Sequence, residues 1–151
     1  MSDILNASYV FLDNPATTVD EVLTFLSEQA VALGIADDAT AVQKALEHRE
    51  SEGTTGMMAG YAIPHCKSAA IKKAAVLVVK FAGDVAWKSM DGAPIRVAIS
   101  LLVPDGEVST AFLKMLSQVA VMLMNEEFRT KIDATDDPDA IVSIIEEGFV
   151  D

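Results

Sequence analysis

Apolar positions in the first third of the chain repeat at the spacing of α-helices. Thr18 and Glu21 stand three residues apart, as in a capping box, where the threonine caps a helix start and the glutamate reaches back. Gly34 offers a stop for the same helix. Between these signals the apolar residues recur every three or four positions, at Val19, Val22, Leu23, Leu26, Ala30 and Leu33. The pattern therefore predicts a first helix from Thr18 to the stop at Gly34.

A second helix is expected to begin near Asp38. One stripe of this helix carries Val42, Ala45, Leu46 and Arg49. Because successive helical residues are about 100° apart, His48 points away from that stripe. We expect Arg49 to face inward and His48 to face solvent.

The middle of the chain changes from helical spacing to nearly continuous apolar runs. Residues 74–81 and 97–103 are β-branched and apolar almost throughout, as strands buried on both faces are. Residues 83–94 between them indicate a loop or short edge strand, with a turn at Asp91-Gly92. The glycines at 53, 56 and 60 make a long helix unfavourable between residues 52 and 62.

Helical spacing returns in the last third of the chain. A third helix is predicted from about Ser109 to Asn125, followed by a helical continuation or a short separate turn over 126–131. Asp137-Pro138 opens a last helix, with proline in its first turn. The inward residues of the third helix are Phe112, Met115, Leu116, Val119, Met122 and Leu123. Helices before and after central strands indicate an α/β fold, a three-layer arrangement in one domain over residues 1–151.

Composition and charge narrow the classes of function. The chain has 151 residues and a formal net charge of −12, from 23 acidic and 11 basic residues. That field repels a phosphate backbone, so nucleic-acid binding is not expected, whereas a basic protein partner would be attracted. No apolar run reaches the roughly 18 residues of a membrane helix, and the N-terminus has no export signal, so we expect no membrane insertion. The single cysteine, Cys66, fits the reducing cytoplasm.

The chemistry that the sequence offers centres on His65, which follows Pro64. A metal site is not expected, because the chain has only two histidines and no second cysteine. Cys66 adjoins His65 and is therefore poorly placed to act with it as nucleophile and base. The glycines do not form a nucleotide-binding loop, since neither a Gly-Lys-Ser/Thr ending nor GxGxxG is present.

His65 remains as a nucleophile in its own right, because imidazole is a competent phosphoryl acceptor. Arg49 offers a planar, bidentate donor for phosphoryl oxygens. The hydroxyls of Thr54 and Thr55 are further candidate donors. Pro64 restricts the residue before it to extended geometry and so fixes how the chain enters His65. On these grounds alone, a loop histidine without a role stays an alternative.

Several motifs together resemble one family over nearly the whole chain: the IIA components (type-2 EIIA) of the phosphoenolpyruvate-dependent sugar phosphotransferase system, fructose–mannitol class. The matching segments are His48-Arg49-Glu50, Gly53–Gly56 (GTTG), Ala62–His65 (AIPH), Asp91–Pro94 (DGAP) before a buried strand, and Glu126–Arg129 (EEFR).

The resemblance implies a mixed, about five-stranded sheet with helices on both sides. It implies that His65 accepts a phosphoryl group on its tele nitrogen, Nε2, from the phosphohistidine of the carrier protein HPr. His65 then passes the group to a cysteine of a cognate IIB protein or domain, which serves sugar uptake and phosphorylation, with a fructose-type sugar as the first expectation. Arg49 would stabilise the phosphoryl group, with Thr54 and Thr55 in support. No metal, nucleotide or other cofactor is implied.

The chain departs from the family pattern in two places. The family's His-Leu-x-x-Leu run supplies a second active-site histidine, whereas this chain reads Phe112–Leu116 (FLKML). We expect the Phe112 ring to face inward and, in the family register, to border His65. The position before Arg49, often glutamate in the family, is His48.

Two other functions remain open beside the transport phosphocarrier. One is a regulatory relative that accepts phosphate and acts by phosphorylation-dependent protein binding. The other is an interaction domain that keeps only the fold, against which the intact His65 and Arg49 argue. A neighbouring gene for a IIB or membrane IIC protein would separate the first reading from the regulatory one.

Overall fold

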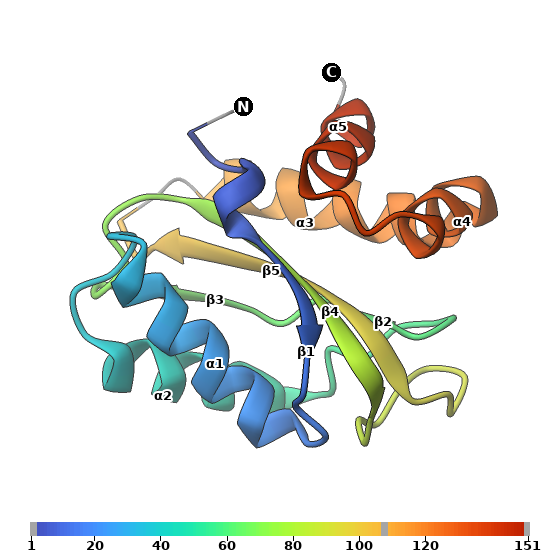
Figure 1. The fold of residues 1–151 in the computed structure, drawn as a ribbon. Coiled ribbons are helices and arrows are strands. Elements are labelled where there is room, and N and C mark those ends of the chain that lie inside the picture. Colours follow the sequence, from blue (N-terminus) through green and yellow to red (C-terminus); the bar gives the residue numbers. More distant parts are fainter. Residues whose placement is uncertain (1–2, 107–108, 150–151) are drawn as a thin grey trace.

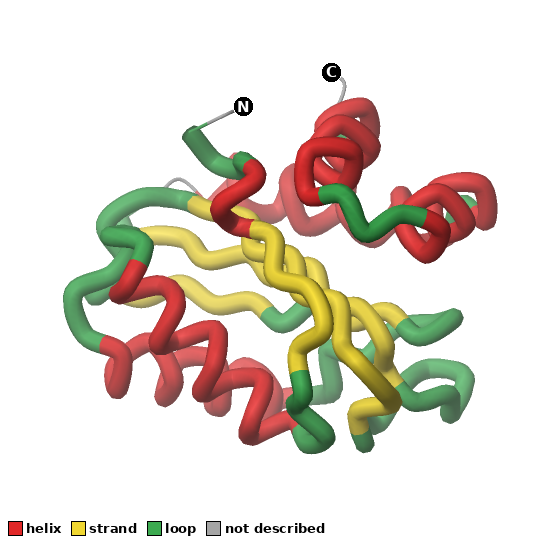
Figure 2. Tube along the Cα trace, viewed as in Figure 1, coloured by secondary structure: helices red, strands yellow, loops and turns green. Residues whose placement is uncertain are grey.

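In the computed structural model, which describes residues 3–106 and 109–149, helices cover both faces of a central sheet (Figure 1). Figure 2 shows the resulting three layers, with strands between two groups of helices. The elements run in the order η1 (Ala7–Tyr9), β1 (Val10–Asn14), α1 (Val19–Ala32), α2 (Ala39–Glu52), β2 (Tyr61–Ala62), β3 (His65–Ser68), β4 (Ala75–Val85), β5 (Ile95–Pro104), α3 (Ser109–Met124), α4 (Glu126–Ala134) and α5 (Pro138–Gly148).

The sheet is mixed and has five strands. β4 and β5 pair antiparallel in its centre, and β1 runs parallel to β4 on the far side. β2 and β3 follow one another along the free edge of β5, both parallel to it, with Tyr61 opposite Val97 and His65 opposite Leu101. The expected α/β fold with a five-stranded mixed sheet is therefore confirmed.

The helix boundaries follow the capping signals of the sequence. Thr18 and Glu21 form both bonds of the capping box, with the Thr18 hydroxyl accepting from the Glu21 N–H and the Glu21 carboxylate from the Thr18 N–H, each at 3.2 Å. Asp38 caps α2 and Asp137 caps α5. Asn125 ends the α3 segment and accepts the Phe128 N–H, so α4 is a separate helix rather than a continuation.

Three strands carry too little pattern to be predicted from the sequence. β1, β2 and β3 have two to five residues each, and they form by pairing with the long apolar strands β4 and β5. β4 also runs to Val85, beyond the predicted end, with a register shift between Lys80 and Val85. His65 was expected in a loop, but it is the first residue of β3.

The helices of the two outer layers approach the same edge of the sheet from opposite faces. α1 and α2 lie on one face of the sheet and α3, α4 and α5 on the other (Figure 1). α2 packs beside β3 at the sheet edge, and α3 packs on β5. The edge next to β3 is therefore reached by helices from both layers. Within the described residues, no helix is long and apolar enough to cross a membrane.

Candidate active site

The loop before β3 is shaped by backbone contacts that position His65. Gly56 pairs with Ala62 and lies so close to the neighbouring loop that a Cβ there would be 2.2 Å from the Lys88 carbonyl oxygen. Only glycine allows this close approach of two backbones. The Ile63 N–H then donates to the Thr55 carbonyl at 3.0 Å. The chain thus enters His65 along a fixed, extended path.

Both nitrogens of the His65 ring have partners that define its tautomer. Nδ1 lies 2.6 Å from the Ile63 carbonyl oxygen, which can only accept, so Nδ1 carries the proton. Arg49 Nε, which can only donate, lies 3.1 Å from His65 Nε2. Nε2 therefore presents a lone pair toward the guanidinium. This is the nitrogen that the sequence analysis named as the phosphoryl acceptor.

Arg49 reaches His65 from the last turn of α2. Its Nη1 donates to the Gly53 carbonyl at 2.8 Å, which fixes the guanidinium at the end of its own helix. The predicted inward stripe is confirmed, since Val42 and Leu46 are buried and His48 is 77% exposed. His48 forms a surface ion pair with Glu52 and lies outside the site.

Burial lowers the pKa of His65, whose side chain is only 7% exposed. The Arg49 guanidinium lowers this pKa further, while the hydrogen bond to the Ile63 carbonyl and the Glu50 carboxylate oppose the shift. The ring is therefore neutral at pH 7, as a nucleophile must be. Burial raises the pKa of the Cys66 thiol to about 12, so this cysteine is protonated and unreactive.

The two threonines are present in the loop, but their hydroxyls are engaged elsewhere. Thr54 donates to the Lys88 carbonyl and accepts the Gly56 N–H. Thr55 is buried, and its hydroxyl donates to Glu50 Oε1 at 2.6 Å. Within the described residues, no hydrogen bond links either hydroxyl to His65. The structure thus gives both threonines a part in holding the loop.

Glu50 is a site residue to which the sequence analysis gave no role. Its Oε2 accepts the Thr55 N–H at 2.8 Å and the Trp87 indole N–H at 3.1 Å, in addition to the bond from the Thr55 hydroxyl. One carboxylate thus joins the end of α2, the loop before β3 and the segment after β4. The position of Glu50 beside Arg49 in the motif was the sequence signal that it belongs to the site. Its bond to Trp87 could not be predicted, because the two residues are far apart in the sequence.

Phe112 comes to His65 from the opposite layer. The ring centroids are 5.9 Å apart and tilted by 47°, and Phe112 is 9% exposed. The expected position of this ring beside His65 is therefore confirmed. The structure adds Lys67, whose Nζ lies 5.6 Å from the Phe112 ring centroid. No signal in the sequence indicated Lys67, because β3, on which it stands two residues after His65, could not be predicted.

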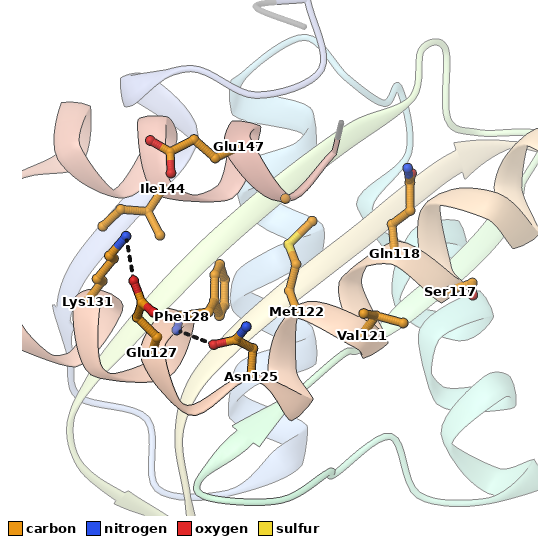
Figure 3. Close-up of a pocket in the computed structure, with 11 residues that line it drawn as sticks. Ser117, Gln118, Val121, Met122, Asn125, Glu127, Phe128, Lys131, Ile144 and Glu147 are labelled. Atoms are coloured by element: carbon orange, nitrogen blue, oxygen red, sulfur yellow. Dashed lines mark hydrogen bonds and ion pairs between the residues drawn. The ribbon is translucent and has the colours of Figure 1, made fainter. Parts of the chain in front are cut away.

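A hollow in the surface lies away from His65. It has a volume of about 510 Å³ and opens between α3, α4 and α5 (Figure 3). Met122, Phe128 and Ile144 contribute apolar surface, and the Lys131–Glu127 ion pair crosses one side. His65 does not line this hollow. Among the described residues, no group of three or more His, Cys, Asp or Glu side chains is arranged to hold a metal ion.

The family described as "Phosphoenolpyruvate-dependent sugar phosphotransferase system, EIIA 2" matches residues 3–148. The chain belongs to this family. The resemblance drawn from the motifs is thereby confirmed, and so is the class of protein, because EIIA components are phosphotransferase proteins.

This type-2 EIIA chain is similar to curated proteins with several different descriptions. It is 32% identical over 149 residues to the PTS system fructose-specific EIIA component of Haloferax volcanii, which covers 97% of this chain and 95% of the relative. It is 34% identical over 105 residues to a nitrogen regulatory protein of Bradyrhizobium diazoefficiens, covering 70% of this chain and 68% of the relative. Against two relatives named as EIIABC components, the chain spans only 20% and 19% of their length.

Solved structures share the EIIA fold. The nitrogen regulatory protein IIA-Ntr from Neisseria meningitidis superimposes with a TM-score of 0.88 over 95% of this chain and 97% of that one. The sequences are 24% identical, so the likeness concerns the fold alone.

Proposed function

We propose that this EIIA chain is a phosphocarrier that accepts a phosphoryl group on His65 Nε2 from HPr and passes it to a cysteine of a IIB protein or domain. The orientation of the His65 ring is the main support. Its Nδ1–H is held by the Ile63 carbonyl, and its free lone pair on Nε2 faces the Arg49 guanidinium. Family membership supports the phosphotransfer itself.

Transfer to His65 balances without loss of a proton from the ring. The N–P bond of the donor phosphohistidine breaks, and its electron pair returns to the donor imidazole. The lone pair of His65 Nε2 forms the new N–P bond. Because Nδ1 keeps its proton, the His65 ring becomes positively charged, and the Ile63 carbonyl stabilises that charge. In the onward step, a IIB thiolate forms an S–P bond while the pair returns to Nε2.

Arg49 is proposed to stabilise the transferred phosphoryl group. A guanidinium has five N–H donors in a rigid fork, and the His65 and Gly53 contacts use only part of this set. When Nε2 is phosphorylated, the Arg49 Nε–H that pointed at the lone pair is positioned to point at phosphoryl oxygens. Thr54, Thr55 and Glu50 support the site by fixing the loop that carries the histidine.

The cellular location of the protein and the sugar that it serves are parts of the same proposal. The reduced, buried thiol of Cys66 suits the cytoplasm. A fructose-type sugar is the first candidate, because the Haloferax relative of nearly equal length is named as fructose-specific.

A regulatory phosphoprotein is the second candidate function. It is favoured by the 34% identity to a protein named as a nitrogen regulatory protein. Here phosphorylation of His65 would switch binding to a target protein rather than feed a transporter. The acceptor chemistry at His65 is the same for both candidates, and onward transfer distinguishes them.

Labelling with phosphoenolpyruvate, enzyme I and HPr tests the acceptor. We expect one acid-labile phosphate per chain in the wild type and none in His65→Ala. His48→Ala is the matched control, because it removes the other histidine from an exposed position and should label normally. Normal labelling of His65→Ala would refute the assignment. Transfer from the labelled chain to a fructose-type IIB protein would favour transport, and its failure would favour the regulatory role.

The role of Arg49 is tested in the same reaction. Arg49→Lys keeps the charge but loses the planar fork, so labelling should slow by about tenfold or more with the fold unchanged. Wild-type kinetics in this variant would show that the fork is not used.

A further inference from the structure

The surroundings of His65 lack one donor that the family pattern provides. The second histidine of the pattern is replaced by Phe112, whose phenyl ring lies 5.9 Å from the His65 ring centroid and donates no hydrogen bond. A phosphoryl dianion held beside an apolar ring would be poorly solvated on that side. A different donor on the Phe112 side of His65 would remove this penalty.

Lys67 occupies that side because of the geometry of β3. Side chains two residues apart on a strand project from the same face of the sheet. His65 pairs with Leu101 and Lys67 with Val103, so the regular pairing extends over both positions. The Phe112 ring lies within 6 Å of both side chains, since Lys67 Nζ is 5.6 Å from its centroid.

The ammonium group of Lys67 is available for a new partner. Among the described residues, no carboxylate lies within ion-pair distance of it, although the chain carries 23 acidic residues. Lys80 and Lys131, by contrast, are paired with Asp136 and Glu127. The Lys67 ammonium instead lies over the face of the Phe112 ring, where a cation is attracted to the ring electrons. This contact is weak enough to be exchanged for an anion.

We propose that Lys67 donates to the phosphoryl oxygens of phospho-His65 and takes over the function of the missing second histidine. In the unphosphorylated protein its ammonium group lies over the Phe112 ring. This inference rests on the proposed phosphorylation of His65. Arg49 approaches the ring from the end of α2 and Lys67 from β3, so the dianion is neutralised from two elements. Lys67 takes no part in bond breaking or bond formation, so the N–P bond changes stay as described for the transfer to His65.

The equilibrium of phosphoryl exchange with HPr isolates this contact. In phospho-HPr + EIIA ⇌ HPr + phospho-EIIA, the equilibrium constant does not depend on how tightly the two proteins dock. Removing a side chain that forms a hydrogen bond only in the phosphorylated form should therefore lower this equilibrium constant directly. We expect Lys67→Met, which keeps the length of the side chain, to lower it about tenfold, the effect of one charge-assisted hydrogen bond.

Four further variants make the assignment specific. Lys73→Met removes another exposed lysine and should leave the constant unchanged. Lys67→Arg keeps a cationic donor and should stay within about threefold of wild type. Phe112→His, introduced into Lys67→Met, should restore most of the loss, because it returns the donor of the family pattern. Phe112→His in the wild-type background should add little.

The outcomes distinguish this inference from the proposed function. If the wild type takes up no label at all, the phosphocarrier function fails. If the wild type is labelled but Lys67→Met has the wild-type constant and the wild-type half-life of phospho-His65, Lys67 has no such role. An equal loss in Lys67→Met and Lys73→Met would likewise overturn the inference, because it would indicate a general effect of net charge.

Discussion

Glu50 provides the sharpest test of how the site is held together. Its carboxylate accepts the backbone N–H and hydroxyl of Thr55 and the indole N–H of Trp87. Glu50→Ala leaves two buried N–H donors without an acceptor, since Thr55 is 3% and Trp87 is 7% exposed. Each such donor costs about 1–3 kcal/mol, and relaxation shared between them makes a total of about 3 kcal/mol our expectation.

Glu50→Gln is the matched variant. Its amide oxygen can replace Oε2 and accept both N–H groups, while its NH₂ can replace Oε1 and donate to the Thr55 hydroxyl. Only the charge assistance is lost, so the cost should be about 1 kcal/mol. The difference between the two variants therefore measures the orphaned donors and not the charge.

Urea unfolding of the two variants gives these free energies. Trp87 is the only tryptophan of the chain, so its fluorescence reports on the site itself, and circular dichroism follows the whole fold. We expect unchanged slopes with urea and a midpoint that falls most for Glu50→Ala. Equal destabilisation by Ala and Gln would show that the hydrogen bonds of Glu50 contribute no more than its charge, and the reasoning would fail.

Three other outcomes follow from the structure. Because the lowered pKa keeps His65 neutral while the unfolded ring gains a proton near pH 6.5, stability should fall as pH drops below about 6.5, and His65→Gln should flatten that slope in urea titrations. Gly56→Ala would place a methyl against the Lys88 carbonyl, so it should destabilise by about 1–3 kcal/mol and slow labelling; a wild-type melting temperature would contradict this. Ser100 is fully buried, and its hydroxyl has no partner among the described residues; Ser100→Ala should therefore raise the unfolding free energy by up to about 1 kcal/mol, and a clear loss would mean that the hydroxyl has a partner.

Local sequence signals are enough to predict the order of the helices and the two central strands. Caps such as Thr18 and Asp137 act within one turn of the helix that they begin, so their effect is readable without tertiary contacts. β4 and β5 are long and apolar enough to be recognised as buried strands. The same holds for the inward direction of Arg49 and Phe112, which follows from helical periodicity.

The short strands and the partners of His65 depend on the tertiary structure. β3 has four residues, and it exists because its backbone groups pair with β5, about 35 residues later in the chain. Glu50 bonds to Trp87 for the same kind of reason, since both are brought together at the sheet edge. Lys67 meets Phe112 only because β3 and α3 belong to adjoining layers. The sequence by itself thus determined the family, and it indicated His65 as the candidate acceptor and Arg49 as the candidate cation. The fold decided the tautomer of His65, the depth of its burial and the cation beside it, because these depend on distances between residues far apart in the chain.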